Sequence, residues 1–179
     1  MMVTLVRVWD EPAEYRETGA ERILIGGRVL RLERSPGGGT PSGPPLDEHL
    51  VAGPGETSWA LLSCADVIVR DGGEPALHRA AFPGCLVLAV NTRNGCLLVA
   101  DGWSARLLPV LGERCAEEDA VAYASSVHAW MVAGRPLGVL TRLTSVRGNA
   151  VAQVRVRDPA MQAAPGAPTV RPAFRRAVP

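Results

Sequence analysis

The sequence predicts an α+β protein with a mostly antiparallel sheet centred on residues 84–101 and one packed helix, residues 119–133. Two apolar runs, Leu86–Val90 and Cys96–Ala100, flank Asn94-Gly95, a dipeptide typical of a tight β-hairpin. Each run is apolar at consecutive positions, so we expect both faces of the hairpin to be covered. With 47% hydrophobic residues, the 179-residue chain can bury one core.

The N-terminal segment has the pattern of strands. Residues 3–8 alternate weakly between apolar and polar side chains, which favours a strand. Arg22–Leu32 predicts a second hairpin, because Gly26 and Gly27 can adopt the positive φ angles of a primed turn. We therefore expect residues 1–34 to form an N-terminal β-arm.

A segment rich in proline and glycine follows this arm. Ser35–Pro45 lacks the residues that hold helix or ladder hydrogen bonds, so residues 35–55 are predicted to form a flexible linker. The core domain is predicted at 56–157. The proline-rich residues 158–179 are predicted to form a disordered tail.

Shorter elements are expected on both sides of the central hairpin. Glu56–Leu62 can begin a helix, and the β-branched residues within Cys64–Val69 favour a strand. Pro75–Phe82 is consistent with a turn or a helical piece, and Ala105–Leu111 with a third strand.

The segment Asp119–Ala133 is predicted to be a helix that buries a single apolar stripe. Acidic residues precede it, where the helix dipole favours anions, and Gly134 with Pro136 ends it. Leu137–Val146 and Ala150–Arg157 then predict a last hairpin.

Charge is distributed unevenly along the chain. All 19 basic residues are arginine, which is typical of a GC-rich genome. The net charge of +1 is the sum of +6 from residue 142 onward and −5 from residues 1–141. A basic tail can contact nucleic acid, an acidic partner or an anionic surface, although such runs are more often simply solvated. No apolar run approaches the ~18–20 residues that span a bilayer, and the first ten residues do not form a signal peptide.

The residues typical of catalytic or metal sites do not assemble at the spacing that these sites require. Cys85 and Asp101 resemble the start of an N-terminal-nucleophile hydrolase, but that chemistry needs a lysine and the chain has none. His49, His78 and His128 have no partner at metal-ligand spacing, and His128 is expected at the helix boundary. We therefore predict no catalytic, cofactor-binding or metal-binding residues and no cofactor.

Two kinds of residue are candidates for a contact surface. Tryptophan is enriched in interface hot spots, which makes Trp103 and Trp130 candidates, although core packing is the commoner role. Arg171, Arg175 and Arg176 form a weak basic motif, but no aromatic residues interleave with them, so nucleic-acid binding is not indicated.

A series of short segments occurs over residues 60–157 and is followed by the proline-rich tail: Val67–Arg70, Pro83-Gly84, Gly95–Asp101, Leu111-Gly112, Asp119–Trp130 and Gly138–Thr141. In these segments the chain resembles a family of small accessory nuclear proteins of the alphaherpesviruses, encoded beside the helicase subunit of the helicase–primase. The resemblance implies a non-enzymatic viral accessory protein of the host nucleus, which associates with viral or host regulatory proteins in nuclear bodies. It implies no catalytic residues.

Residues 83–157 are also similar to the roadblock/LC7 adaptors, which share a hairpin ending in Ala-Asp-Gly, a helix and further strands. This alternative implies a homodimer in the bacterial cytoplasm that scaffolds a small GTPase. The extra β-rich N-terminus and the missing C-terminal helix count against it.

Overall fold

The structure is a computed structural model that describes residues 3–11, 21–34, 44–93, 95–100, 102–108, 116–140, 142–145 and 151–156. Within these residues the α+β class is confirmed. The elements in chain order are β1 (Thr4–Glu11), β2 (Glu21–Ile25), β3 (Arg28–Arg34), β4 (Asp47–Ala52), α1 (Trp59–Cys64), β5 (Val67–Asp71), α2 (Pro75–Ala81), β6 (Val87–Thr92), β7 (Gly95–Ala100), β8 (Trp103–Leu108), α3 (Glu117–Val132), the 3₁₀ turn η1 (Leu137–Val139), β9 (Arg142–Ser145) and β10 (Val151–Val156).

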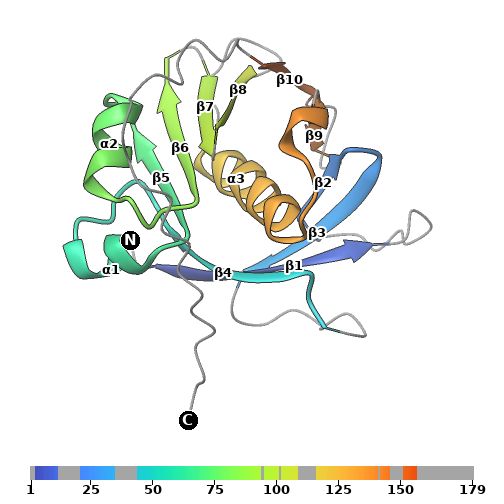
Figure 1. Ribbon diagram of the computed structural model, residues 1–179, viewed down its shortest axis with the longest axis horizontal. Coiled ribbons are helices and arrows are strands. Elements are labelled where there is room, and N and C mark those ends of the chain that lie inside the picture. Colours follow the sequence, from blue (N-terminus) through green and yellow to red (C-terminus); the bar gives the residue numbers. More distant parts are fainter. Residues whose placement is uncertain are drawn as a thin grey trace.

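The strands form one sheet that curls until its ends meet, in the order β1-β3-β2-β9-β10-β8-β7-β6-β5-β4. The sheet is mixed, whereas the sequence predicts a mostly antiparallel one. The pairs β4–β5 and β5–β6 are parallel, because a helix connects the strands of each pair. Figure 1 shows the strands curving around α3.

The helices α1 and α2 lie outside the curled sheet, on the side of β5 and β6 (Figure 1). They cover a small apolar cluster that includes Leu62, Ile68, Phe82 and Leu88. The opposite side chains of β5 and β6 point into the main core around α3. Because both faces of these strands are covered, every residue of Val87–Val90 is buried, as the consecutive apolar run predicts.

The two predicted glycine hairpins are confirmed. β6 pairs with β7, but the register differs from a turn centred on Asn94-Gly95: Gly95 is the first residue of β7, lies opposite Thr92 and has a φ of 106°. β2 pairs with β3 through Gly26 and Gly27, whose φ angles are 53° and 78°. These positive angles explain why glycine occupies all three positions.

The helix α3 is the centre of the main core. Its predicted position is confirmed, but the single buried stripe is wrong: every residue from Ala120 to Trp130 is buried. The sheet surrounds this helix, which packs against β1–β6. Small side chains at positions such as Ala124 and Ser125 allow the strands to approach the helix closely.

The N-terminal strands are part of the same closed sheet and do not form a separate arm at 1–34. β1 pairs with β4, β2 pairs with β9, and Val6, Ile23 and Leu30 belong to the main core. The predicted linker at 35–55 contains β4, a strand with four buried residues. The apolar alternation of Asp47–Ala52 is short and includes charged residues, which is why the pattern alone did not identify a strand.

Residues 35–43 of the predicted linker and the tail at 158–179 lie outside the described residues. Among the helices of the described ranges, none has the length and apolar character needed to cross a membrane.

Candidate functional site

A buried polar cluster lies between β4 and α3, inside the sheet. Residues of β4 alternate, so Asp47, His49 and Val51 point inward while Glu48 is exposed. Asp47 pairs with Val8 and His49 with Val6 of β1, two positions in the apolar core. A carboxylate and an imidazole therefore enter an interior that is otherwise mostly apolar.

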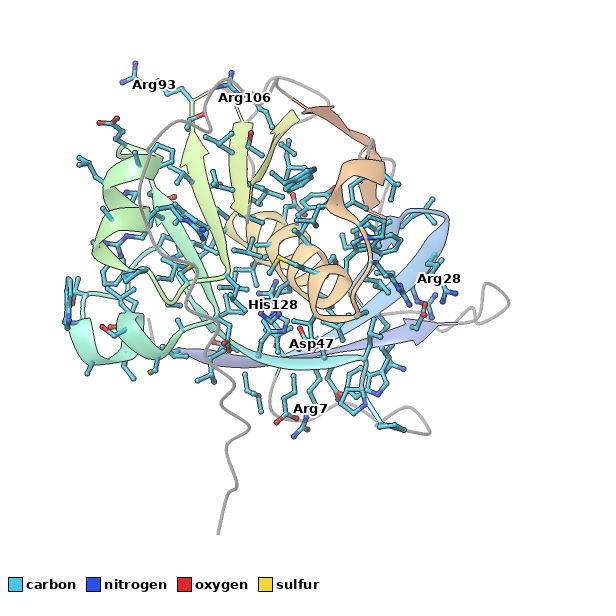
Figure 2. The ribbon with its side chains drawn as sticks, viewed as in Figure 1. Arg7, Arg28, Asp47, Arg93, Arg106 and His128 are labelled. Atoms are coloured by element: carbon cyan, nitrogen blue, oxygen red, sulfur yellow. The ribbon has the colours of Figure 1, made fainter. Side chains whose placement is uncertain are left out.

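The third member of the cluster is His128 of α3, which the sequence analysis expects at a boundary. It is only 3% exposed, because α3 is surrounded on all sides. Its Nδ1 donates to Asp47 Oδ2 across 2.5 Å, and Figure 2 shows the two residues facing each other between β4 and α3. His49 Nδ1 lies 2.8 Å from the same oxygen, and the two imidazole centroids are 4.4 Å apart.

The charges of this cluster follow from burial and from its internal contacts. Burial opposes ionisation of Asp47, but the contacts with His128 and His49 outweigh it and hold the pKa of the carboxyl well below its usual range. Burial lowers the pKa of His49, although the contact with Asp47 acts in the opposite direction. The cluster therefore contains a carboxylate beside an imidazole that favours its neutral form.

The histidines have unused nitrogen atoms. Both ring nitrogens of His49, and Nε2 of His128, are buried and make no hydrogen bond within the described residues. His49 Nδ1 is close to Asp47 but not aligned for a hydrogen bond. Ligand atoms from the three residues lie within 4.8 Å of one another, so the cluster has the donor types of a transition-metal site.

The spacing of ligand residues along the sequence does not reveal this cluster, because its members are not all close together in the chain. His128 is 81 positions away from Asp47 along the chain, and only the closed sheet brings them together. One signal was present: Asp47 and His49 are two residues apart, which places them on the same face of a strand. Assigning 35–55 to a linker concealed that signal. The expectation of no metal ligands stays a prediction.

The residues proposed for a contact surface are not brought together. Trp103 and Trp130 are buried in the core around α3, the commoner role weighed above. Trp130 Nε1 donates to Pro136 O across 3.1 Å, and the Arg135 guanidinium lies 4.9 Å from its ring centroid. Arg171, Arg175 and Arg176 lie outside the described residues.

Cys85, the candidate nucleophile, and His78 both contact backbone carbonyl groups. Cys85 is buried, and its thiol donates to Val87 O across 3.0 Å. Burial raises the pKa of Cys85 to about 11, which keeps the sulfur protonated at neutral pH. His78 Nε2 lies 3.2 Å from Gly72 O, beside the loop that precedes α2. Asp101 lies outside the described residues.

The exposed tryptophan of the described residues is Trp59, at the start of α1. Its side chain is 64% exposed, and one side of its ring contacts Phe82, with centroids 4.9 Å apart. Leu77 of α2 and Leu86, just before β6, are also exposed large apolar residues. We call the outer side formed by α1, α2 and Leu86 the α1–α2 face.

No protein-family model, curated protein or solved structure matched the chain when it was compared with each of the three groups.

Proposed function

We propose that the protein is a non-enzymatic viral accessory protein of the host nucleus, which acts by binding viral or host regulatory proteins through its α1–α2 face. The exposed indole of Trp59 carries this proposal. Solvent-exposed tryptophan is costly to leave in water and is the residue type most enriched at interface hot spots. The viral and nuclear setting rests on the resemblance described above.

Two further observations support binding through this face. Leu77 and Leu86, which are 66% and 41% exposed, are further apolar side chains in or just after α2, the helix whose C-cap Phe82 contacts Trp59. Ser58 caps α1 through Leu61 N, and the Trp59 ring rests on Phe82, so the indole is held on a folded element. A preorganised anchor loses less conformational entropy when a partner binds.

The localisation of a tagged full-length chain in mammalian cells, alone and during alphaherpesvirus infection, tests the proposal. We expect the wild-type chain to enter nuclear bodies during infection and the Trp59→Ser variant to be diffuse. Val139→Ser is the matched control, because Val139 is 54% exposed but lies in η1, away from α1 and α2 in the chain.

A diffuse cytoplasmic signal of the wild-type chain under both conditions would refute the nuclear assignment. Recruitment of Trp59→Ser to the same extent as wild type would instead show that another surface makes the contact. Co-purification of partners from infected cells, compared between Trp59→Ser and Val139→Ser, separates these two results.

The roadblock/LC7-like alternative, an adaptor that dimerises and scaffolds a small GTPase in a bacterium, remains a second prediction. It requires a symmetric dimer, so the mass of the purified chain in solution tests it directly.

A further inference from the structure

We propose that Asp47, His49 and His128 bind one divalent transition-metal ion of the zinc class, which fastens α3 to β4 inside the closed sheet. The three residues supply one carboxylate oxygen and one nitrogen from each ring. This donor set, two imidazoles and a carboxylate, suits Zn²⁺ and related ions and does not suit Mg²⁺ or Ca²⁺, which prefer oxygen ligands.

The first argument is the burial of the cluster. The side chains of Asp47, His49 and His128 are 6%, 0% and 4% exposed, so water does not compensate their polar atoms. Burying a carboxyl group and two imidazoles in an apolar core is strongly unfavourable unless their polar atoms have partners. A bound divalent ion would be a shared partner for all three side chains.

The second argument is the set of unused ring nitrogens. Polar atoms buried in a folded protein are nearly always paired, yet three nitrogens of His49 and His128 make no hydrogen bond within the described residues. A ring nitrogen without a hydrogen bond has a lone pair that it can donate to a metal ion. Asp47 already contacts both rings through one oxygen, so the imidazoles are held beside each other.

The third argument is the small size of the rearrangement that binding requires. Bonds of 2.0–2.1 Å at a tetrahedral angle separate two ligand atoms by about 3.4 Å. Asp47 Oδ2 lies 2.5 Å from His128 Nδ1 and 2.8 Å from His49 Nδ1. The ligand atoms therefore need to separate by less than about 1 Å if the ion uses these nitrogens, and the proton of His128 Nδ1 then moves to the unpaired Nε2. Rotation of the side chains is sufficient for such a shift.

The position of the cluster assigns the ion a structural role. Three protein ligands leave a tetrahedral ion one further coordination position, but these side chains are almost completely enclosed, so a substrate cannot reach that position. His128 lies about one turn before the C-terminal end of α3, and Asp47 begins β4, which is paired to both β1 and β5. One ion at this point would join the helix to the sheet.

Zinc content of the full-length chain tests the proposal. Protein purified from zinc-supplemented medium, or stripped with a chelator and incubated with Zn²⁺, is separated from free metal and measured by mass spectrometry. We expect about one zinc per chain, and a rise in Tm of roughly 5–10 °C at free zinc one hundred times Kd. A chain that retains no zinc in either preparation would overturn the proposal.

Three variants locate the ion. Asp47→Asn and His128→Gln keep side chains of similar size but remove a charge or an imidazole, and we expect each to weaken zinc binding at least about tenfold. His78→Gln is the matched control, because His78 contacts Gly72 O and lies outside the cluster. Unchanged zinc affinity in Asp47→Asn and His128→Gln would overturn the proposal.

X-ray absorption of the zinc-bound wild-type chain decides the question even if the variants fail to fold. Ligation by the cluster gives only nitrogen and oxygen neighbours at about 2.0 Å, whereas a cysteine ligand gives sulfur at about 2.3 Å. Cys64, Cys85 and Cys96 are not in disulfide bonds, so this distinction matters. Sulfur bound to the zinc would assign the metal to cysteine and refute the proposed site.

Discussion

Replacing Gly26 with alanine tests the packing of the β2–β3 turn against α3. A Cβ built at Gly26 overlaps the Trp130 ring, far inside van der Waals contact. Trp130 cannot move away easily, because it is buried in the core and its Nε1 donates to Pro136 O. The methyl group would therefore displace the indole or deform the turn.

The size of this effect can be separated from backbone strain by using the neighbouring glycine. Gly26 and Gly27 both have positive φ, which costs an alanine about 1–2 kcal/mol at either position. Gly27 has nothing within 4 Å of its Cβ position, so Gly27→Ala carries the backbone cost alone. Overpacking against Trp130 adds about 1–3 kcal/mol in Gly26→Ala.

Urea unfolding of the full-length variants measures this difference. We expect the free energy of unfolding of Gly26→Ala to lie about 1–3 kcal/mol below that of Gly27→Ala, equivalent to roughly 2–12 °C in Tm. In a Trp130→Phe background the smaller ring should recover much of the difference, as a double-mutant cycle can show. Equal destabilisation by the two alanines, within about 0.5 kcal/mol, would refute the close approach of Gly26 to Trp130.

Two further variants test buried polar groups. Burial raises the pKa of Cys85 from the ordinary thiol value of 9.0 to about 11. Between these pH values the unfolded chain therefore binds fewer protons than the folded chain, and the free energy of unfolding falls as pH rises. We expect a loss of up to about 2–3 kcal/mol between pH 9 and 11 that is absent in Cys85→Ala, measured by urea unfolding across that range; equal pH dependence of the two proteins would contradict this. Ser125 Oγ is buried in α3 and has no hydrogen-bond partner within the described residues, so Ser125→Ala should raise stability by up to about 1 kcal/mol. Ser126→Ala is its control, because Ser126 donates to Ala122 O across 2.9 Å; a loss of stability in Ser125→Ala as large as that in Ser126→Ala would show that Ser125 Oγ has a hydrogen-bond partner.

Local patterns predicted the elements of the fold more reliably than they predicted the fold's closure. The Gly26-Gly27 turn, the hairpin at Gly95 and the helix from Glu117 depend on neighbouring residues, so the sequence identifies them. The pairing of β2 with β9 joins residues near positions 24 and 144, and no local pattern records it. The same long-range pairing explains why the N-terminal strands looked like a separate arm.

The helix α3 illustrates how closure changes the meaning of a sequence pattern. Its larger apolar residues suggest one buried stripe, because Ala and Ser are too small to mark a second face. In a closed sheet those small residues are what the surrounding strands require, since they let β1–β6 approach the helix axis. His128 then becomes an interior residue without any change in its local sequence.

The two proposals concern opposite sides of β4–β6 and have different energetic consequences. Asp47 and His128 lie inside the sheet, so changes there act on folding stability and reach a partner only through the fold. Trp59 lies outside it, where a polar substitution removes exposed apolar surface and leaves the core residues in place. A variant that loses zinc but keeps its partner, and another that loses its partner but keeps zinc, would therefore establish that the metal supports the fold while the α1–α2 face performs the binding.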